Sequence, residues 1–506
     1  GQTNQGFNAV AIGNTAGRNT QGQSAVAIGS GAGQNIQQSN AIAIGTNAGL
    51  DSQGFSAVAI GRSAGQYLQG TNAVAIGISA GQDGQQSNAV AVGYQAGQTN
   101  QGTNAVAIGY QAAQYSQGQN TVAIGNQAGQ FNQATGSLAI GYQAGYTGQD
   151  QFCIALGYQA GISQQFRRGI AIGQQAGQYS QGSASISIGY LAGQSTQGQS
   201  SIAIGQNAGQ TMQSVYCIAI GDRSGQTMQQ YGSIALGLQS GQSRQGQYGI
   251  AIGFQTGVNT QGSSSISIGY QAGQNIQRMN AISIGDSAGQ SGQGTYSISI
   301  GSFAGQTGQQ ENSIAIGYQA GNVSQLSNAI ALGYQAGYTN QATYSIAIGY
   351  QAGMTNQAAN SICLNATTSG YSPATANAFY VNPVRNVVTT TNPLYYDSTT
   401  FEIRYNSSSR RFKENIQNIN IDTSKVLQIT PKEFNGIGTT DFVPIGYIAE
   451  ELYDIEPQFS TLDKDGEIEG VNVAIINACV LEEVKKNRLE IIELKKEIEN
   501  LKKLIN

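Results

Sequence analysis

Short alternations of branched apolar and small residues recur along most of this chain at a fixed spacing. The pattern Ala-Val-Ala-Ile-Gly occupies residues 9–13 and again 25–29, and its glycine returns every 16 residues as far as Gly349, without an insertion or deletion. There are 22 such units, and residues 361–365 (Ser-Ile-Cys-Leu-Asn) form a degenerate twenty-third. A fixed short period without slippage is typical of a solenoid, in which each repeat stacks on the next.

Each unit predicts one short β-strand. Val10 and Ile12 alternate with Ala9 and Ala11, which is the period of a strand rather than of a helix. We expect the branched residues to face the interior of the coil, and the small residues to face a neighbour that leaves little room. Gly13, and the Ala-Gly pair that follows it, mark corners that need positive φ or close backbone approach. The remaining Gln-x-x-Gln-Gly stretch is polar and variable, and it predicts a turn exposed to water.

These features predict a mostly β chain, a parallel β-solenoid shaft of 16-residue coils. One such coil cannot bury its own apolar pair, so the coils must stack on one another. At roughly 4.8 Å per stacked strand, the shaft would extend about 110 Å. Because its interior is thin, we expect several shafts to pack around a shared dry axis. A disordered Gln/Asn/Gly-rich tract is the competing interpretation, and the unbroken register argues against it.

Composition divides the chain. Residues 1–365 hold no Pro, no Lys and only six acids, whereas residues 366–506 hold every Pro, every Lys and 20 of the 26 acids. We therefore predict a shaft over residues 1–365, a β neck or cap over residues 366–407 and a mixed α/β domain over residues 408–506. In the neck, the aromatic and β-branched stretches 377–385 and 394–405 predict short strands or a hairpin that covers the open edge of the solenoid.

Charge and hydropathy disfavour several classes of partner. The formal net charge is −4 and no basic patch occurs, which argues against nucleic acid. No apolar run reaches the length of a membrane span and no signal peptide opens the chain, so we expect no membrane insertion. The chain begins in mid-repeat, as a piece of a longer protein would.

Candidate metal or disulfide residues are few, and we predict no cofactor and no metal. Cys153, Cys217 and Cys363 stand at small-residue positions of the repeat, which favours a role as small apolar fillers. The acidic segment 463–466 (Asp-Lys-Asp-Gly) lacks the full ligand set of a calcium loop, so a plain turn is favoured.

The strand motif Asn/Ser-Ala/Ser-Val/Ile-Ala/Ser-Ile-Gly resembles the head repeat of trimeric adhesins of the YadA type, over residues 1–365. The resemblance implies a trimeric, left-handed parallel β-roll. The period of 16 differs from the shorter unit usual in that family, so the corners can differ. We do not expect the membrane β-barrel with which those adhesins end.

The end of the chain predicts a long helix from about Val471 to Asn506 with a coiled-coil seam. Asn487 occupies a core position of that seam and would fix the alignment of the chains. Ile at one seam position with Leu at the other more often favours two strands, so the seam alone leaves the number of chains open. The apolar seam residues are Val484, Ile491, Leu494, Ile498, Leu501 and Ile505.

Residues 408–506 resemble the C-terminal intramolecular chaperone domain of endosialidases, phage tail spikes and related fibres. Ser408, Lys413 and Ile416 match the opening of that family, residues 446–451 (Gly-Tyr-Ile-Ala-Glu-Glu) are similar to its second block, and the long helix is similar to its third. Ser409 departs from the family, which often has Asp at that position.

This second resemblance implies a homotrimer that then cleaves itself between Ser407 and Ser408. With no His in the chain, Ser408 would be the nucleophile, and Lys413 would be the base, because a buried lysine can lose its proton. The alternative is that residues 407–409 are an ordinary polar linker and that Lys413 is a solvated charge.

Two functions follow from these observations. The first is a viral or phage-like trimeric surface fibre, located on a virion surface or outside the cell, whose C-terminal chaperone drives assembly and is then cut off. The second is an adhesin whose Gln-, Asn- and Tyr-rich ridges contact a host-surface glycan or receptor. We expect no enzyme acting on outside substrates, because the shaft has no recurring catalytic cluster.

Overall fold

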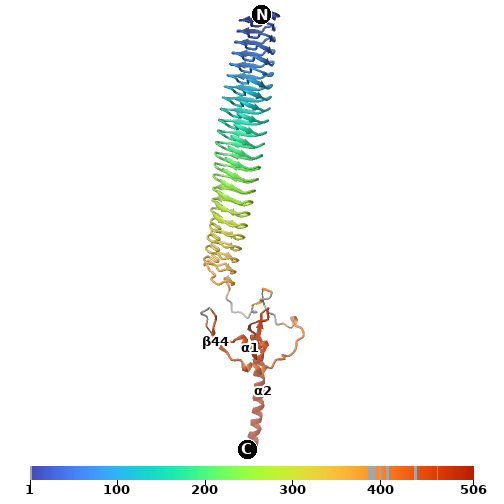
Figure 1. The fold of residues 1–506 in the computed structure, drawn as a ribbon. Helices are drawn as coiled ribbons and strands as arrows, with labels where there is room; N and C mark the ends of the chain where they lie inside the picture. The colour runs from blue at the N-terminus through green and yellow to red at the C-terminus, as the bar shows by residue number, and fades with distance from the viewer. Residues whose placement is uncertain are drawn as a thin grey trace. The chain divides into compact units, whose positions relative to one another are not determined.

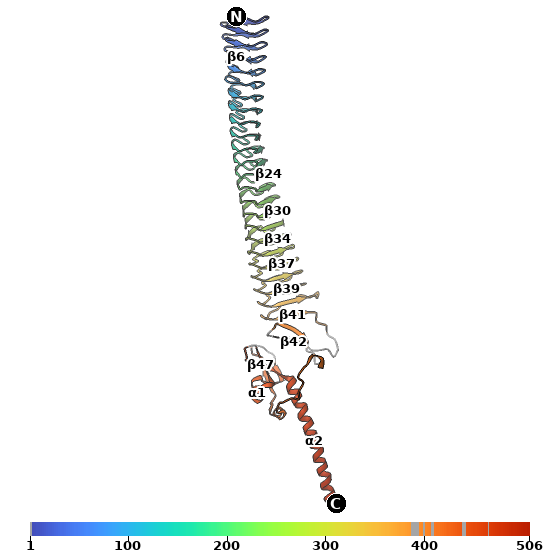
Figure 2. The ribbon, with the colours of Figure 1, turned by 90° about the vertical axis from the view of Figure 1, so that its right-hand side faces the viewer.

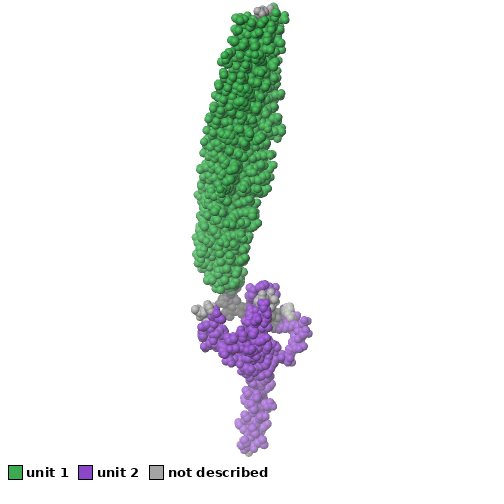
Figure 3. All heavy atoms as spheres, in the orientation of Figure 1, with its two compact units in different colours: residues 1–384 green, residues 385–506 purple. Residues whose placement is uncertain are grey.

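The computed structural model describes residues 3–385, 394–397, 400–405, 409–437, 442–463 and 465–505. The chain divides into two compact units, residues 1–384 and residues 385–506 (Figure 3). The first unit holds the repeats, and the second holds the two α-helices of the described residues.

The first unit is a stack of coils in which each coil adds one strand to a 24-stranded sheet (Figure 1). This first-strand sheet begins with β1 (Val10–Ile12) and β3 (Val26–Ile28), and ends with β40 (Ile362–Asn365) and β41 (Phe379–Asn382). Its strands pair in parallel, and through β40 each residue lies beside the one 16 positions further along. Figure 2 shows these strands stacked from β24 to β41. The predicted parallel β-solenoid of 16-residue coils is therefore confirmed.

A second short strand crosses the other side of most coils. These strands form a four-stranded sheet from β2 (Thr20–Gln21) to β8 (Tyr67–Gln69), and a 13-stranded sheet from β11 (Thr99–Gln101) to β35 (Ser291–Gln293). They lie in the polar stretch that the sequence predicts to be an exposed turn. That prediction is wrong, because one glutamine of each stretch points into the coil.

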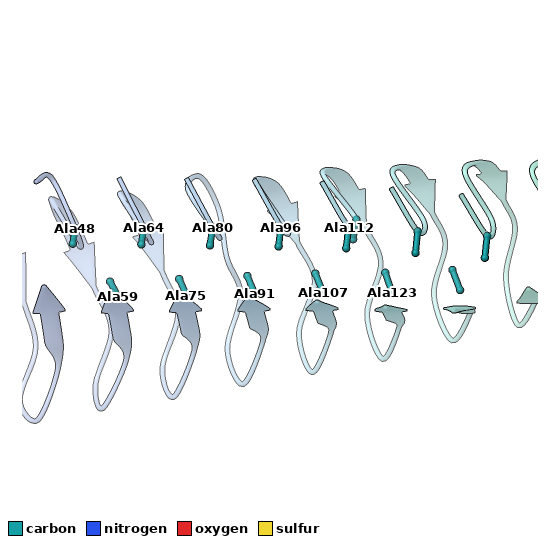
Figure 4. Packing of buried hydrophobic residues seen from close by; sticks show 14 of the residues in the cluster. Ala48, Ala59, Ala64, Ala75, Ala80, Ala91, Ala96, Ala107, Ala112 and Ala123 are labelled. Atoms are coloured by element: carbon teal, nitrogen blue, oxygen red, sulfur yellow. The ribbon is translucent and has the colours of Figure 1, made fainter. Parts of the chain in front are cut away.

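Small side chains fill the interior. Two columns of alanines, one from the first strand and one from the corner after it, point toward each other through the stack (Figure 4). The prediction that Val and Ile face the interior is wrong, since Ala59 is fully buried while Ile60 beside it stays 36% exposed. The physical reason is space. A Cβ added at Gly65 would lie 2.7 Å from Cδ of the inward-pointing Gln69, so branched side chains do not fit inside.

One glutamine per coil completes the interior. It recurs every 16 residues and is buried from Gln21 to Gln357. Its Nε2 donates across the coil to the carbonyl oxygen of the first branched residue of the first strand, as Gln21 does to Val10 at 2.7 Å. In many coils it also donates to the next glutamine of the column, so the polar interior is hydrogen-bonded along the shaft.

The recurring corner glycine has a steric cause. Gly13 has φ +128°, and a Cβ there would lie 2.6 Å from the carbonyl oxygen of Gly29 in the next coil. The same contact repeats along the column, with 2.6 Å between a Cβ at Gly205 and the oxygen of Gly221. The predicted close backbone approach is confirmed, and it excludes any side chain at this position.

Asn365 ends the glycine column. It stands 16 residues after Gly349, and its Nδ2 donates to the carbonyl oxygens of Tyr350 and Ser369, both at 2.7 Å. One further strand, β41, pairs with β40 through residues 17 positions apart. The strand predicted within residues 377–385 therefore continues the shaft sheet, and the parallel sheet runs on past residue 365.

The second unit combines hairpins, short 3₁₀ turns and two helices around a small core. The long helix α2 covers Val473–Ile505, close to the predicted span. The core is formed by Val426, Leu452, Phe459, Ile476 and Cys479. The other elements are the antiparallel pairs β42 (Leu394–Asp397) with β43 (Glu402–Tyr405), β44 (Lys432–Asn435) with β45 (Phe442–Gly446) and β46 (Ser460–Leu462) with β47 (Ile468–Val471), the helix α1 (Ala449–Ile455), and the 3₁₀ turns η1 (Arg410–Phe412), η2 (Thr423–Gln428) and η3 (Pro457–Phe459).

Candidate functional site

The outer surface of the first-strand sheet is a continuous apolar face, which we call the Val/Ile face. It consists of the two branched residues of every first strand, equivalent to Val10 and Ile12. The second of them remains 38% exposed in the middle of the shaft at Ile220 and near its end at Ile348. Monomeric soluble proteins rarely expose contiguous apolar patches larger than a few hundred Å², and larger patches mark interaction sites. The Val/Ile face is therefore the main candidate functional surface of the shaft.

Aromatic residues widen this face in parts of the shaft. In β30 (Ile250–Phe254) the alternation of the strand places Phe254 on the same side as the two isoleucines. Its ring stacks on Tyr270 of the next coil, with centroids 5.1 Å apart and planes 6° from parallel. Tyr334 and Tyr350 stack in the same way, at 5.1 Å and 5°. These rings cover one another along the stack and turn their edges outward.

The helix α2 carries a second unpartnered apolar surface. The predicted seam residues are exposed along it, with Ile491 at 51%, Leu494 at 49% and Ile498 at 50%. Half-exposed Ile and Leu at coiled-coil spacing form a face that a second helix can cover. A helix from another chain can therefore pack against the seam.

A polar contact fixes the start of α2 to the turn η2. Glu483 is nearly buried, and its carboxylate accepts hydrogen bonds from the hydroxyl of Thr423 and, at 2.7 Å, from Nζ of Lys486. These hydrogen bonds lower the pKa of Glu483, and the one to Glu483 raises the pKa of Lys486. The charged pair therefore holds α2 against η2, and sequence reasoning missed the contact because Thr423 lies 60 positions before Glu483 in the chain.

The predicted cleavage residues are only partly visible. Ser407 and Ser408 lie outside the described residues. Lys413 follows η1, is exposed, and donates its backbone N–H to the carbonyl oxygen of Arg410 at 3.1 Å. The burial that the base role would require is not supplied by the described part of its own chain.

The cysteines and the acidic turn have structural roles. Cys153 and Cys217 are fully buried at small-residue positions, and burial raises the pKa of Cys153 to about 11. The carboxylate of Asp463 accepts hydrogen bonds from the backbone N–H groups of Asp465 (2.8 Å) and Glu467 (2.9 Å), which is how an aspartate stabilises a turn. Within the described residues, no group of His, Cys, Asp and Glu side chains is placed to hold a metal ion.

A family model describes part of the shaft. The YadA head domain repeat matches residues 101–113 in two copies. This segment contains the buried Gln101, the strand β12 (Val106–Ile108) and the corner Gly109. No curated protein and no solved structure matches the chain. Among the described residues, no helix has the length and the apolar character that crossing a membrane requires. The matched repeat and the β-solenoid together fit a YadA-like, adhesin-like fibre.

Proposed function

We propose that this chain is the shaft and the assembly unit of a homotrimeric fibre located outside the cell. The observation that carries the proposal is the Val/Ile face, which runs along the solenoid and which the described residues of the chain leave partly exposed. Three shafts that turn this face inward would share a dry core, while the polar second-strand side would stay in water. The similarity to the YadA head repeat supports three chains, since that is the assembly its family implies.

The C-terminal unit would start the assembly. Identical coils can pair in many registers, because a slip by one rung still matches branched residues with branched residues. Helix α2 offers a seam that can join the chains at one end before the shafts zip together.

In this proposal the unit acts as an intramolecular chaperone and is then released by cleavage between Ser407 and Ser408, with Ser408 as nucleophile and Lys413 as base. A neighbouring copy would have to bury Lys413. The phage-like, virion-borne setting rests on this resemblance alone.

An adhesin is the second candidate function. In it, the fibre contacts a host-surface glycan or receptor through the outward-facing polar and aromatic ridges. The exposed tyrosines and amides on the second-strand side favour it. The two functions are compatible, and only the second one needs a ligand.

Native mass spectrometry tests the assembly directly. We expect the full chain, or the chain without its C-terminal unit, to give a trimer. A monomer or a dimer at every concentration tested would overturn the proposal. Limited proteolysis of the assembled fibre would separately show whether the shaft is protected from end to end.

A further inference from the structure

Two adjacent coils carry methionine at an outward second-strand position that is polar in most other coils. The outward position of this strand holds Met212 in β25 (Thr211–Gln213) and Met228 in β27 (Thr227–Gln229). The two methionines lie side by side, because Thr211 pairs with Thr227 and Gln213 with Gln229. Met212 is 54% exposed, so an apolar strip faces water here.

A cluster of three tyrosines borders this strip. Tyr231 lies between Tyr216 and Tyr248 in edge-to-face contacts, each with ring centroids 5.6 Å apart. All three rings are exposed, Tyr248 at 56%. This arrangement differs from the face-to-face stacks on the Val/Ile side, where neighbouring rings cover each other.

The methionines and Tyr231 line an open cleft of about 310 Å³. That volume is at the lower end of the range for small-molecule sites. No charged residue lines the cleft, which disfavours a phosphate or another polyanion as its occupant. The lining residues are Met212, Ser214, Met228, Gln229, Gln230, Tyr231 and Gln247.

The polar groups of the cleft are free to bind. Among the described residues, the side chains of Ser214, Gln230 and Gln247 have no hydrogen-bond partner. Nearby glutamines do pair, as Gln226 donates to Gln210 at 3.0 Å. The cleft thus combines an apolar floor with two amides and a hydroxyl that offer both donors and acceptors.

The cleft lies on the side of the coil opposite the Val/Ile face. Gln229, which ends β27, points inward and donates to the carbonyl oxygen of Ile218 at 2.8 Å, across the coil. Ile218 begins β26 (Ile218–Ile220), the first strand of the same coil, whose outer side is the Val/Ile face. Covering that face with neighbouring chains would therefore leave the cleft open to solvent.

We propose that this cleft binds an oligosaccharide. A sugar ring has an apolar C–H face, which suits the methionine and tyrosine surfaces, and a rim of hydroxyls, which suits unpaired amides. Arg244 stands beside Met228 in the next coil, where Ser243 pairs with Thr227, and can meet a carboxylate at the edge of an acidic sugar. The inference rests on the proposed fibre, and it gives the adhesin function a location and a ligand class.

The test uses the full-length fibre on an array of neutral and carboxylated glycans, followed by titration calorimetry with the glycans that bind. We expect Tyr231→Ala and Gln247→Ala to weaken binding at least tenfold. The matched control is Gln199→Ala, which removes an exposed glutamine from the same position of the repeat three coils earlier and should leave binding unchanged.

The outcomes separate the two proposals. No glycan binding, binding unaffected by both cleft variants, or capture of a peptide instead would overturn the saccharide site. Native mass spectrometry of the same samples reports on the trimer independently. If the unaltered protein forms no trimer, the fibre proposal is overturned, whatever the glycan array shows.

Discussion

Gln85 donates a hydrogen bond from its Nε2 to the backbone carbonyl oxygen of Val74, 2.9 Å away on the other side of the same coil. It also donates to Gln101 at 3.0 Å, and its Oε1 accepts from Gln69 at 3.1 Å. A buried amide in this position joins the two strands of one coil and links that coil to both neighbours. The shaft is therefore held by a polar column as much as by apolar packing.

Replacing Gln85 by leucine should destabilise the shaft. The change takes a donor from the Val74 carbonyl oxygen and leaves Oε1 of the buried Gln101 without its donor, whereas Gln69 keeps its hydrogen bond to Val58. A buried polar group left without a partner costs about 1–3 kcal/mol. Gln86→Leu is the matched control, since Gln86 is exposed and should change stability by less than about 0.5 kcal/mol. Denaturant unfolding followed by circular dichroism measures both. Equal effects of the two variants would contradict the role of the column.

Ala113 is a position where the backbone of the shaft is strained. It takes the place of the second corner glycine and has φ +46°, a left-handed conformation that is costly for a residue with a Cβ. We expect Ala113→Gly to raise the free energy of unfolding by about 0.5–1 kcal/mol, the relief of strain exceeding the added entropy of the unfolded chain.

The neighbouring alanine provides the comparison for this prediction. Ala112 is equally buried but has no left-handed backbone, so Ala112→Gly should lower stability by a similar amount. Chemical denaturation should shift the midpoint of unfolding in opposite directions for the two variants. A loss of stability in Ala113→Gly would show that the strain is absent.

The strand, the period and the corner glycine could be predicted from the sequence, because each is a local pattern. The orientation of the strand could not, since alternation identifies two faces without saying which one is inside. Size decided it, because Gln69 already occupies the interior beside Gly65 and leaves room only for small side chains such as alanine and serine. The column of glutamines was visible as a repeat, but single polar residues are usually exposed.

The contacts of the C-terminal unit were harder to foresee. The helix α2 and its seam follow from local apolar spacing. The pairing of Thr423 with Glu483 joins residues far apart in the sequence, and no motif marks it. The predicted catalytic residues Ser408 and Lys413 remain a prediction.

Charges on the Val/Ile face should prevent the shafts from joining. Ile204→Glu with Ile220→Glu would bury two carboxylates between chains, and burying an unpaired charge is strongly unfavourable. The control pair Ser180→Glu with Thr196→Glu lies in two adjacent second strands, at outward positions. Light scattering after size-exclusion chromatography should show a trimer for the control and smaller species for the face variant. A stable trimer in both cases would mean that another surface joins the chains.

Self-cleavage makes a prediction about mass. The assembled wild-type protein should yield a released piece of residues 408–506, and intact-mass spectrometry detects it directly. Ser408→Ala should abolish the cut, because it removes the nucleophilic hydroxyl, and Lys413→Ala should slow it severely. Ser409→Ala keeps both groups and should cleave normally. Persistence of the full-length chain after complete assembly would rule out the mechanism.

The pair of Glu483 and Lys486 predicts how the C-terminal unit responds to pH. Because the folded pKa of Glu483 is lowered, its contribution is present above the unfolded value of about 4.3 and is lost as the pH falls through the folded pKa. The folded pKa of Lys486 is raised, so its contribution is present below about 10.4 and is lost as the pH rises through the folded pKa. Both losses weaken the attachment of α2 to η2.

A neutral residue at position 483 should remove the acid limb of this response. Glu483→Gln would lower stability at neutral pH and leave a flatter profile below pH 4.3 or so, since no carboxylate remains to be protonated. Glu482→Gln is the control, because the half-exposed Glu482 forms its ion pair with Lys485, at 2.6 Å, on the surface of the same helix. Hydrogen exchange within the full chain reports the stability of the C-terminal unit. Measured at a series of pH values, it distinguishes the two variants. If both variants kept the wild-type acid limb, a different carboxylate would have to account for it, and the attachment of α2 to η2 would depend on apolar packing alone.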